Sequence, residues 1–416
     1  MFAFTDFCRS GYGSAELEKA IEEIDRITEH EKIYGDGTDF FVFEKAREEQ
    51  GNEGRKTFLF RKAERSEDGE PSIKVRTKRE PPFQVLKGTE EEKYLSDVSS
   101  TGLMLSRGEG EFQELLGFSA SAMKVLCYKI GLTGPRISDG NSCYRNLSVV
   151  ELLTNPENEM RPRKKNKNVK CDVPYIDNLV FTTRRYGKNR RFRVVSGVTT
   201  GKAHRNRPRE VLAACRKIME MEWADNAEIG EWSFLDNMLS INIYFKGKEH
   251  RYTMHDGTET VLTPGIKVID SDCGKASWTL GAFISTGNGK KYIKTLRKKH
   301  DGYFNIEKGS VSWMNENIIP EFERYFEQAE KMEETLIHEE NGVLETVRRL
   351  GVERLKEFGK KKFRVFESAV VRRAMQTGSC SEMFIEISII DAEHIVEQEM
   401  PRHNIRQSKT AAGRRR

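Results

Sequence analysis

The stretch Met238-Leu-Ser-Ile-Asn-Ile-Tyr-Phe245, followed by Lys246-Gly-Lys-Glu249 and His250-Arg-Tyr-Thr-Met254, decides the fold class of this chain. Apolar and polar side chains alternate in the first segment, which is typical of a half-buried strand. The last segment is suited to pair with it across the four residues between them, so we expect a β-hairpin. Further strands are predicted at residues 265–269 and 276–285. Together these segments indicate an antiparallel sheet.

Helical periodicity marks several other segments. Residues 14–33 carry apolar side chains at three- and four-residue spacing, and a short helix is predicted at 144–153. Ser119 is placed to cap a helix over residues 117–131, and Pro208 is placed to open one over 209–223. After Pro320 the pattern is helical throughout. We expect helices there at 321–339, 342–358, 361–376 and 381–398, with one apolar seam made by Phe322, Phe326, Ala329 and Leu336.

Short apolar runs predict the remaining strands. These runs lie at residues 39–43, 57–61, 72–77, 178–183 and 190–196. The last two runs are joined around residues 184–188. By contrast, the lysine-rich segment 290–299 is expected to form a short helix that is positively charged nearly all round.

The pattern of elements predicts an α+β fold with an antiparallel sheet core, flanking helices and a C-terminal helical region. We expect an N-terminal α+β region at residues 1–110 and a basic α+β core, the candidate nucleic-acid-binding domain, at 111–315. A C-terminal helical region would follow at 316–406. Residues 407–416 form a polar, basic stretch that is expected to be a disordered tail.

Positive charge is concentrated between residues 161 and 210. These fifty residues hold sixteen Lys and Arg against three acidic residues, a balance of +13, whereas the whole chain carries +5. Everything outside this window therefore sums to −8. Such a field attracts polyanions, nucleic acid above all, because phosphate contacts release condensed counterions. A solvated charged loop is the alternative interpretation.

Basic and aromatic side chains are interleaved in the basic window, a pattern that suits single-stranded ligands whose bases stack on rings. Tyr186 is the candidate stacking residue, while Phe181 and Phe192 fit a core position equally well. A second basic run surrounds Tyr292, and its alternative interpretation is a solvated surface helix. The candidate nucleic-acid-binding residues are Arg184, Arg185, Tyr186, Lys188, Arg190, Arg191, Arg193, Lys202, Arg205, Arg207, Lys290, Lys291 and Lys294.

Two motifs contain residue types that chemistry could use. Gly197-Val-Thr-Thr-Gly201-Lys202 is one residue short of a P-loop and has Ala203 where Ser or Thr would hold magnesium, so a simple phosphate contact is favoured over nucleotide hydrolysis. Asp270 and Asp272, with His255, are the candidate metal ligands of a nuclease. Ordinary turn chemistry explains the same residues. The sequence assigns no catalytic residue, and no cofactor is expected.

The remaining features concern location and partners. No run approaches about 18 apolar residues, so neither a membrane-spanning helix nor a membrane partner is expected. The N-terminus does not read as a signal peptide. Seven scattered cysteines are typical of a reducing compartment, which predicts a cytoplasmic protein, in the host cell if it is viral. The sequence leaves homo-oligomerisation open.

Four groups of residues carry a family resemblance. They are Leu116-Gly-Phe-Ser-Ala-Ser-Ala-Met-Lys-Val-Leu126, Phe192-Arg-Val-Val-Ser196 with Glu210-Val-Leu212, Leu262-Thr-Pro-Gly-Ile-Lys-Val-Ile269 with Ala276-Ser-Trp-Thr279, and Glu382-Met-Phe-Ile-Glu-Ile-Ser388 with Ala392-Glu393. In this order they resemble an uncharacterised family of phage- and plasmid-borne proteins, over residues about 110–405. Ile284-Ser-Thr-Gly-Asn-Gly289 stands where the family often has a cysteine-asparagine-glycine stretch. The resemblance implies a mobile-element protein in DNA replication or recombination, and no catalytic residue.

The sequence therefore predicts a nucleic-acid-binding protein of a mobile element, with single-stranded DNA favoured, acting in recombination, annealing or replication. One alternative is a metal-dependent nuclease using Asp270 and Asp272. The other is a structural or interaction protein that assembles through its C-terminal helices.

Overall fold

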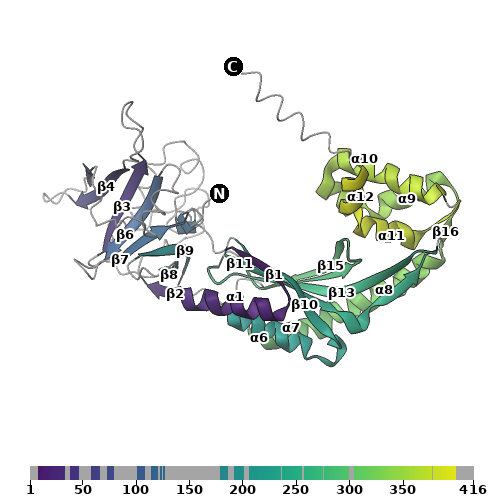
Figure 1. Ribbon diagram of the computed structural model, residues 1–416, viewed down its shortest axis with the longest axis horizontal. Coiled ribbons are helices and arrows are strands. Elements are labelled where there is room, and N and C mark those ends of the chain that lie inside the picture. Colours follow the sequence, from purple (N-terminus) through teal and green to yellow (C-terminus); the bar gives the residue numbers. More distant parts are fainter. Residues whose placement is uncertain are drawn as a thin grey trace, which may run out of the picture. The chain divides into compact units, whose positions relative to one another are not determined.

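The computed structural model describes residues 8–32, 38–45, 58–65, 73–78, 101–107, 114–119, 122–123, 125–126, 179–185, 192–200, 206–235, 237–254, 257–274, 276–298, 304–376 and 378–399. The fold belongs to the α+β class, as expected, with a mostly antiparallel sheet, flanking helices and a C-terminal helical region (Figure 1). The chain forms two units. One comprises Met1–Val211, Trp232–Ser240 and Ile269–Ser277, and the other comprises Leu212–Glu231, Ile241–Val268 and Trp278–Arg416.

The first unit contains an eight-stranded sheet. In spatial order its strands are β2 (Thr28–Lys32), β8 (Leu179–Arg184), β9 (Phe192–Thr200), β7 (Glu114–Phe118), β6 (Thr101–Arg107), β3 (Thr38–Lys45), β4 (Phe58–Arg65) and β5 (Ile73–Lys78). Neighbouring strands are antiparallel except β7 and β9, which are parallel. Because β6 pairs with β7, the sheet runs across residue 110, where the sequence predicted a domain boundary.

Helix α1 (Ser14–Ile27) leads into this sheet. Its apolar stripe is buried through Leu17, Ile21 and Ile24, as the spacing predicted. The predicted end at residue 33 is wrong, because residues 28–32 leave the helix and form β2, which pairs with β8. Hydrogen bonding to a strand more than 150 residues away outweighs a local helical preference there.

A helix was also expected from residue 117. Gly117 and Phe118 instead complete β7, but the described residues 122–123 and 125–126 that follow Ser119 are helical, as expected. The Ser119 hydroxyl accepts a hydrogen bond from the backbone N–H of Ala122 at 3.1 Å, as a helix cap does. The predicted helix at 144–153 and the tail at 407–416 lie outside the described residues.

The second sheet has seven strands. Six of them follow the order β1 (Arg9–Tyr12), β10 (Ala227–Leu235), β11 (Met238–Phe245), β13 (Glu259–Asp270), β14 (Thr279–Ser285) and β15 (Lys290–Arg297), and β12 (His250–Thr253) pairs with β13. The strand 238–245 is confirmed, but its predicted hairpin with 250–254 is wrong. A 3-10 turn at Lys246–Lys248 follows β11, and β12 pairs in register with residues 259–262 of β13 instead.

The basic segment 290–297 is a strand and not the predicted helix. It forms β15, antiparallel to β14, with Ser285 opposite Lys290 and Thr279 opposite Arg297. The connection needs glycine, because Gly287 has φ 88. The Thr286 hydroxyl accepts hydrogen bonds from the backbone N–H groups of Asn288 and Gly289. The chain therefore reverses at once and returns along β14, which overrides the helical preference of lysine.

Helices α7 (Ile306–Trp313) and α8 (Ile319–Glu334) run along one side of this sheet (Figure 1). The Phe322 ring on α8 stacks on Trp223, with 5.5 Å between centroids, and meets the edge of the Phe245 ring of β11. Phe322, Phe326 and Ala329 form the predicted buried seam. Leu336 does not belong to it, because it lies in the short strand β16 (Leu336–Ile337) and is 48% exposed.

The C-terminal helices pack around their own core. They are α9 (Glu340–Leu350), α10 (Val352–Gln376), α11 (Glu382–Ile390) and α12 (Ala392–Glu399), and β17 (Cys380–Ser381) pairs with β16. Phe363, Phe366 and Val370 of α10 are buried in this core. Gly359 breaks α10 with φ 73, at the place where the sequence predicted two helices, 342–358 and 361–376, to be separated. The predicted boundary at 315–316 falls inside a π-helical turn, Met314–Ile318.

Over the described part of the chain, no helix is long and apolar enough to span a membrane.

Candidate nucleic-acid interface

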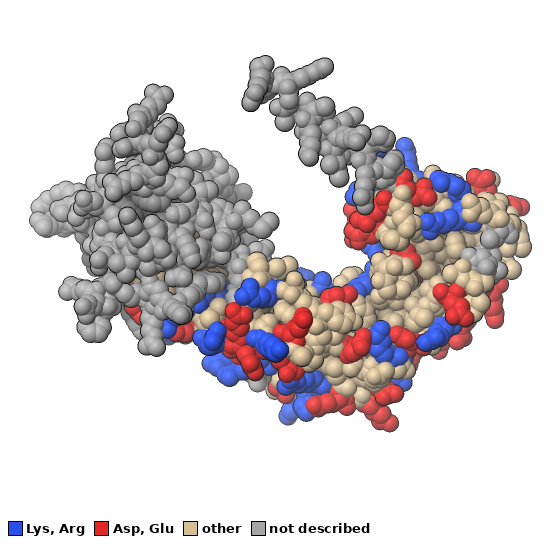
Figure 2. All heavy atoms as spheres, viewed as in Figure 1, with Lys and Arg blue, Asp and Glu red and all other residues tan. Residues whose placement is uncertain are grey.

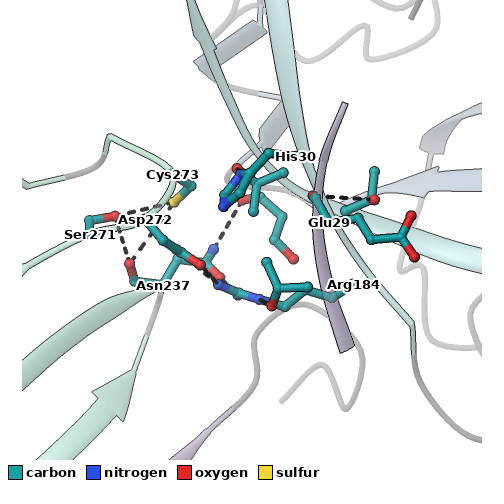
Figure 3. Close-up of polar contacts among 11 residues, drawn as sticks. Glu29, His30, Arg184, Asn237, Ser271, Asp272 and Cys273 are labelled. Carbon is teal, nitrogen blue, oxygen red and sulfur yellow. Dashed lines mark hydrogen bonds and ion pairs between the residues drawn. The ribbon is translucent and has the colours of Figure 1, made fainter. Parts of the chain in front are cut away.

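Arg184, a candidate phosphate ligand, lies in the interior of the first unit. Its side chain is fully buried, and its Nη2 atom donates to both carboxylate oxygens of Asp272 at 2.9 and 3.0 Å. It also contacts the Asn237 side chain and donates from Nε to the Thr28 hydroxyl at 3.2 Å (Figure 3). Arg184 therefore forms a buried ion pair with Asp272. Removing two charges from water costs free energy, and the additional hydrogen bonds around the pair help to offset that cost.

Arg193 on β9 is held in the same way. It is buried, and its Nη2 atom donates to the two carboxylate oxygens of Glu114 at 3.0 Å each, while Nη1 lies 3.0 Å from Glu31. Glu29 also pairs with it, and Glu29 lies 3.4 Å from the partly exposed Arg185. Two of the candidate arginines are thus matched by carboxylates within the fold.

Asp270 and Asp272 are buried as well. The amide of Asn206 donates to Asp270 at 2.8 Å, and Asp272 holds Arg184. Within the described ranges, no group of three or more His, Cys, Asp or Glu is arranged to hold a metal ion. His255 lies outside those ranges. Each carboxylate of the proposed nuclease pair therefore has an internal donor.

The glycine-rich segment at residues 197–202 begins inside a strand. Gly197 is part of β9, and a Cβ there would lie 2.0 Å from the Cβ of Cys273. Close packing against residue 273 accounts for this glycine. Arg207 is exposed just before α6 (Pro208–Met219). The other basic-window candidates, Tyr186, Lys188, Arg190, Arg191, Lys202 and Arg205, lie outside the described residues.

Strand geometry divides the second basic run, because successive side chains of a strand point to opposite faces and a bulge between Tyr292 and Lys294 puts Lys294 on the same face as Lys291. Lys291 pairs with Glu386 of α11, and Lys294 lies 3.2 Å from Glu321 of α8. Lys290 instead contacts side chains of the neighbouring strands. Figure 2 shows acidic and basic side chains interspersed over the described part of the face drawn.

A set of side chains on the face of the second unit's sheet that carries Lys290 forms the best candidate site. We call it the sheet-face cluster. Its members come from five adjacent strands and are Glu231 (β10), Asn242 and Tyr244 (β11), Lys267 (β13), Phe283 (β14), and Lys290 and Tyr292 (β15).

Three aromatic rings cross the sheet in this cluster. The Tyr244 and Phe283 centroids lie 5.5 Å apart, and those of Phe283 and Tyr292 lie 5.9 Å apart, both edge to face. The ammonium of Lys290 lies 5.1 Å from the centroids of both Tyr244 and Phe283, a cation–π distance. Tyr244 and Phe283 are buried, whereas Tyr292 is 49% exposed. The row therefore ends in a ring that a ligand can reach.

Each ring lies over a glycine of a neighbouring strand. The pairs are Gly230 with Tyr244, Gly265 with Phe283, and Gly281 with Tyr292. A Cβ on these glycines would lie 2.3, 2.6 and 3.3 Å from the nearest ring atom, in that order. The glycines therefore let the rings lie close to the backbone.

Glu231 is the cluster's carboxylate, with a side chain that is 55% exposed. Its Oε2 atom accepts from the Tyr244 hydroxyl at 2.7 Å, from Lys290 at 3.1 Å and from the Asn242 amide at 3.2 Å. Burial alone would raise the pKa of Glu231, but hydrogen bonds from the Tyr244 hydroxyl, from the backbone of Glu231 itself and from Lys290 outweigh it and lower the pKa to about 2. Glu231 is therefore ionised and held in one orientation.

The cluster carries one more positive than negative charge. Burial lowers the pKa of the half-buried Lys267, and the neighbouring charge of Lys290 lowers it further, while Glu231 acts in the opposite direction. The buried Oδ1 atom of Asn242 has no hydrogen-bond partner. An exposed ring, two lysines, an oriented carboxylate and an unsatisfied amide oxygen therefore meet on one face.

Of these residues, the sequence singled out only Lys290 as a ligand, and Tyr292 as its neighbour. Glu231, Tyr244 and Lys267 were missed because they are separated along the chain and meet only through strand pairing. The available signal was the alternation of Ser240, Asn242 and Tyr244, which puts polar and aromatic side chains on the face opposite Ile241 and Ile243. No protein-family model, curated protein or solved structure matches this chain.

Proposed function

We propose that the protein binds single-stranded nucleic acid, with DNA favoured, and that the sheet-face cluster contacts bases and phosphates. The observation that carries the proposal is the half-exposed Tyr292 ring beside Lys290. Sheets that bind single strands stack bases on exposed aromatic side chains and neutralise phosphates with nearby cations. Tyr292 takes the first role, and Lys290 and Lys267 take the second.

The basic window supports the same function. Without Arg184 and Arg193, whose charges are matched inside the fold, residues 161–210 still carry a balance of +11. Basic residues precede β9 at 184–191 and follow it at 202–209. The nine residues of β9, which lie between these two stretches in the sequence, span about 26 Å. A polymeric anion matches such a distribution better than a small phosphate compound.

The biological setting belongs to this proposal. The resemblance of residues about 110–405 to phage- and plasmid-borne proteins favours recombination, annealing or replication of a mobile element, inside a host cytoplasm. No described contact favours nuclease chemistry.

Fluorescence anisotropy with a labelled single-stranded oligonucleotide tests the proposal through Tyr292→Ala. Stacking contributes about 1–3 kcal/mol per base, so we expect roughly a tenfold loss of affinity or more. Tyr12→Ala is the matched control, because Tyr12 on β1 is an exposed tyrosine outside the cluster.

Lys290→Ala extends the test to the phosphates. We expect weaker binding and a shallower dependence of log affinity on log salt, by about 0.7 for one lost contact to a single strand. Lys217→Ala, an exposed lysine paired with Glu220 on α6, should leave both quantities unchanged. Wild-type affinity in both Tyr292→Ala and Lys290→Ala would remove the cluster from the interface, and absence of binding by the wild-type protein near 100 mM salt would overturn the function.

A further inference from the structure

Glu231 is an unexpected residue in a surface that binds a polyanion. Its negative charge repels phosphate, yet three side chains from two other strands hold it in place. Lys290 offsets this charge at 3.1 Å, and Lys267 adds a second cation, so the cluster as a whole still attracts anions. A carboxylate kept ionised and oriented within such a surface suits recognition of something other than a phosphate.

The side-chain donors around Glu231 all bind the same carboxylate oxygen. The hydrogen bonds from Tyr244, Asn242 and Lys290 all go to Oε2, and the side chain is more than half exposed. Oε1 therefore lies outside this set of bonds. An ionised carboxylate only accepts hydrogen bonds, so a group that binds Oε1 must be a donor.

Tyr292 is electrostatically coupled to this carboxylate. Burial raises the pKa of the Tyr292 hydroxyl, and the charge of Glu231 raises it further. Lys290 links the two residues, because it donates to Glu231 and lies over Phe283, whose ring meets that of Tyr292. A base stacked on Tyr292 thus has an oriented acceptor on the same face of the sheet.

We propose that Glu231 reads the edge of the base stacked on Tyr292 and selects bases that carry an exocyclic amino group. This inference rests on the proposed function. Cytosine presents an amino donor where thymine and uracil present a carbonyl oxygen, and a carboxylate attracts the first and repels the second. The preferred ligand is then a single strand containing cytosine or another amino-bearing base, rather than a thymine or uracil tract.

Oligo-dC and oligo-dU of equal length provide the sharpest comparison, because these bases differ only along the edge in question. In anisotropy titrations at one salt concentration, the wild-type protein should bind oligo-dC roughly tenfold more tightly than oligo-dU, the discrimination typical of one good base contact. In Glu231→Gln the ratio should fall towards one, because the amide can also donate to the uracil carbonyl. The ratio should fall mainly because Glu231→Gln binds oligo-dU more tightly, since a negative charge has been removed from the surface.

Glu228→Gln is the matched control, with the same change of charge on the same strand, and it should keep the wild-type ratio. Equal binding of oligo-dC and oligo-dU by the wild-type protein would overturn base selection while leaving nucleic-acid binding intact. A wild-type ratio in Glu231→Gln would remove Glu231 from the selection. Failure of the wild-type protein to bind either strand would overturn the proposed function itself.

Discussion

Basic side chains have different roles at different positions in this protein. Arg184 is buried and has the Asp272 carboxylate and other polar side chains as partners, so its charge is satisfied inside the fold. Lys290 is only partly buried, and it meets one carboxylate and two aromatic rings at a surface that a ligand can reach. The number of internal partners, and not the basic character of the side chain, separates a structural cation from a candidate ligand-binding one.

Removing one partner of the buried pair should be costly. Asp272→Ala leaves Arg184 buried without its carboxylate, which typically costs about 3–5 kcal/mol of unfolding free energy. Urea unfolding followed by circular dichroism measures this loss. The double variant Arg184→Met/Asp272→Leu should recover most of it, because no charge then remains buried. A loss below about 1 kcal/mol in Asp272→Ala, the range of exposed pairs, would contradict the structural role.

At the level of the elements, the strand conformation of β15 places its lysines on two different faces of the sheet. Its lysines would surround a helix, but on a strand they divide between the helices on one face and the cluster on the other. The neighbouring strands complete the arrangement with glycines beneath the aromatic rings. The cluster is therefore a property of five strands in register and not of any one of them.

Two glycines of these strands should respond differently to the same substitution. A Cβ in Gly265→Ala would meet the buried Phe283 ring at 2.6 Å and the Ile243 carbonyl oxygen at 2.7 Å, so we expect a loss of about 1–3 kcal/mol. Gly281→Ala meets the Tyr292 ring at 3.3 Å, and this half-exposed ring can move away. Thermal unfolding of the two variants compares them. An equal loss in both would contradict the packing described here.

Across the whole molecule, charge is distributed unevenly along the chain. The basic window carries a net charge of +13 and the rest of the chain −8. Two arginines of the window, Arg184 and Arg193, form ion pairs with carboxylates inside the fold. Under the proposed function, the remaining charge would supply the long-range attraction, and the sheet-face cluster would supply stacking and hydrogen bonding. Electrostatic attraction is screened by salt, but stacking is much less so.

This division predicts distinct effects for the two regions. Arg190→Ala/Arg191→Ala should weaken binding to single strands and reduce the salt slope by about 0.7 for each lost phosphate contact. Anisotropy titrations between 50 and 200 mM salt measure the slope. Lys217→Ala/Lys331→Ala, the same loss of charge at exposed positions of α6 and α8, is the control. An unchanged slope in the arginine variant would remove residues 190 and 191 from the interface.

Local sequence patterns were enough to predict the fold class, about half of the described strands, and most of the helical C-terminal region. They were enough because alternation in residues 238–245 and three- and four-residue spacing in α1 and α8 are local signals that survive folding. The break at Gly359 was equally visible. Each of these depends on neighbours in the chain and on the backbone preferences of single residues.

Strand pairing, and the candidate site that depends on it, could not be predicted from the sequence. Residues 28–32 became a strand because β8 lies beside them, and β12 pairs with β13 because hydrogen bonding across the sheet is not encoded by proximity in sequence. Likewise, Arg184 pairs with Asp272, which is 88 positions away in the sequence, and Glu231 pairs with Lys290, which is 59 positions away. Such contacts arise from packing and hydrogen bonding over long sequence separations, and no local pattern contains them.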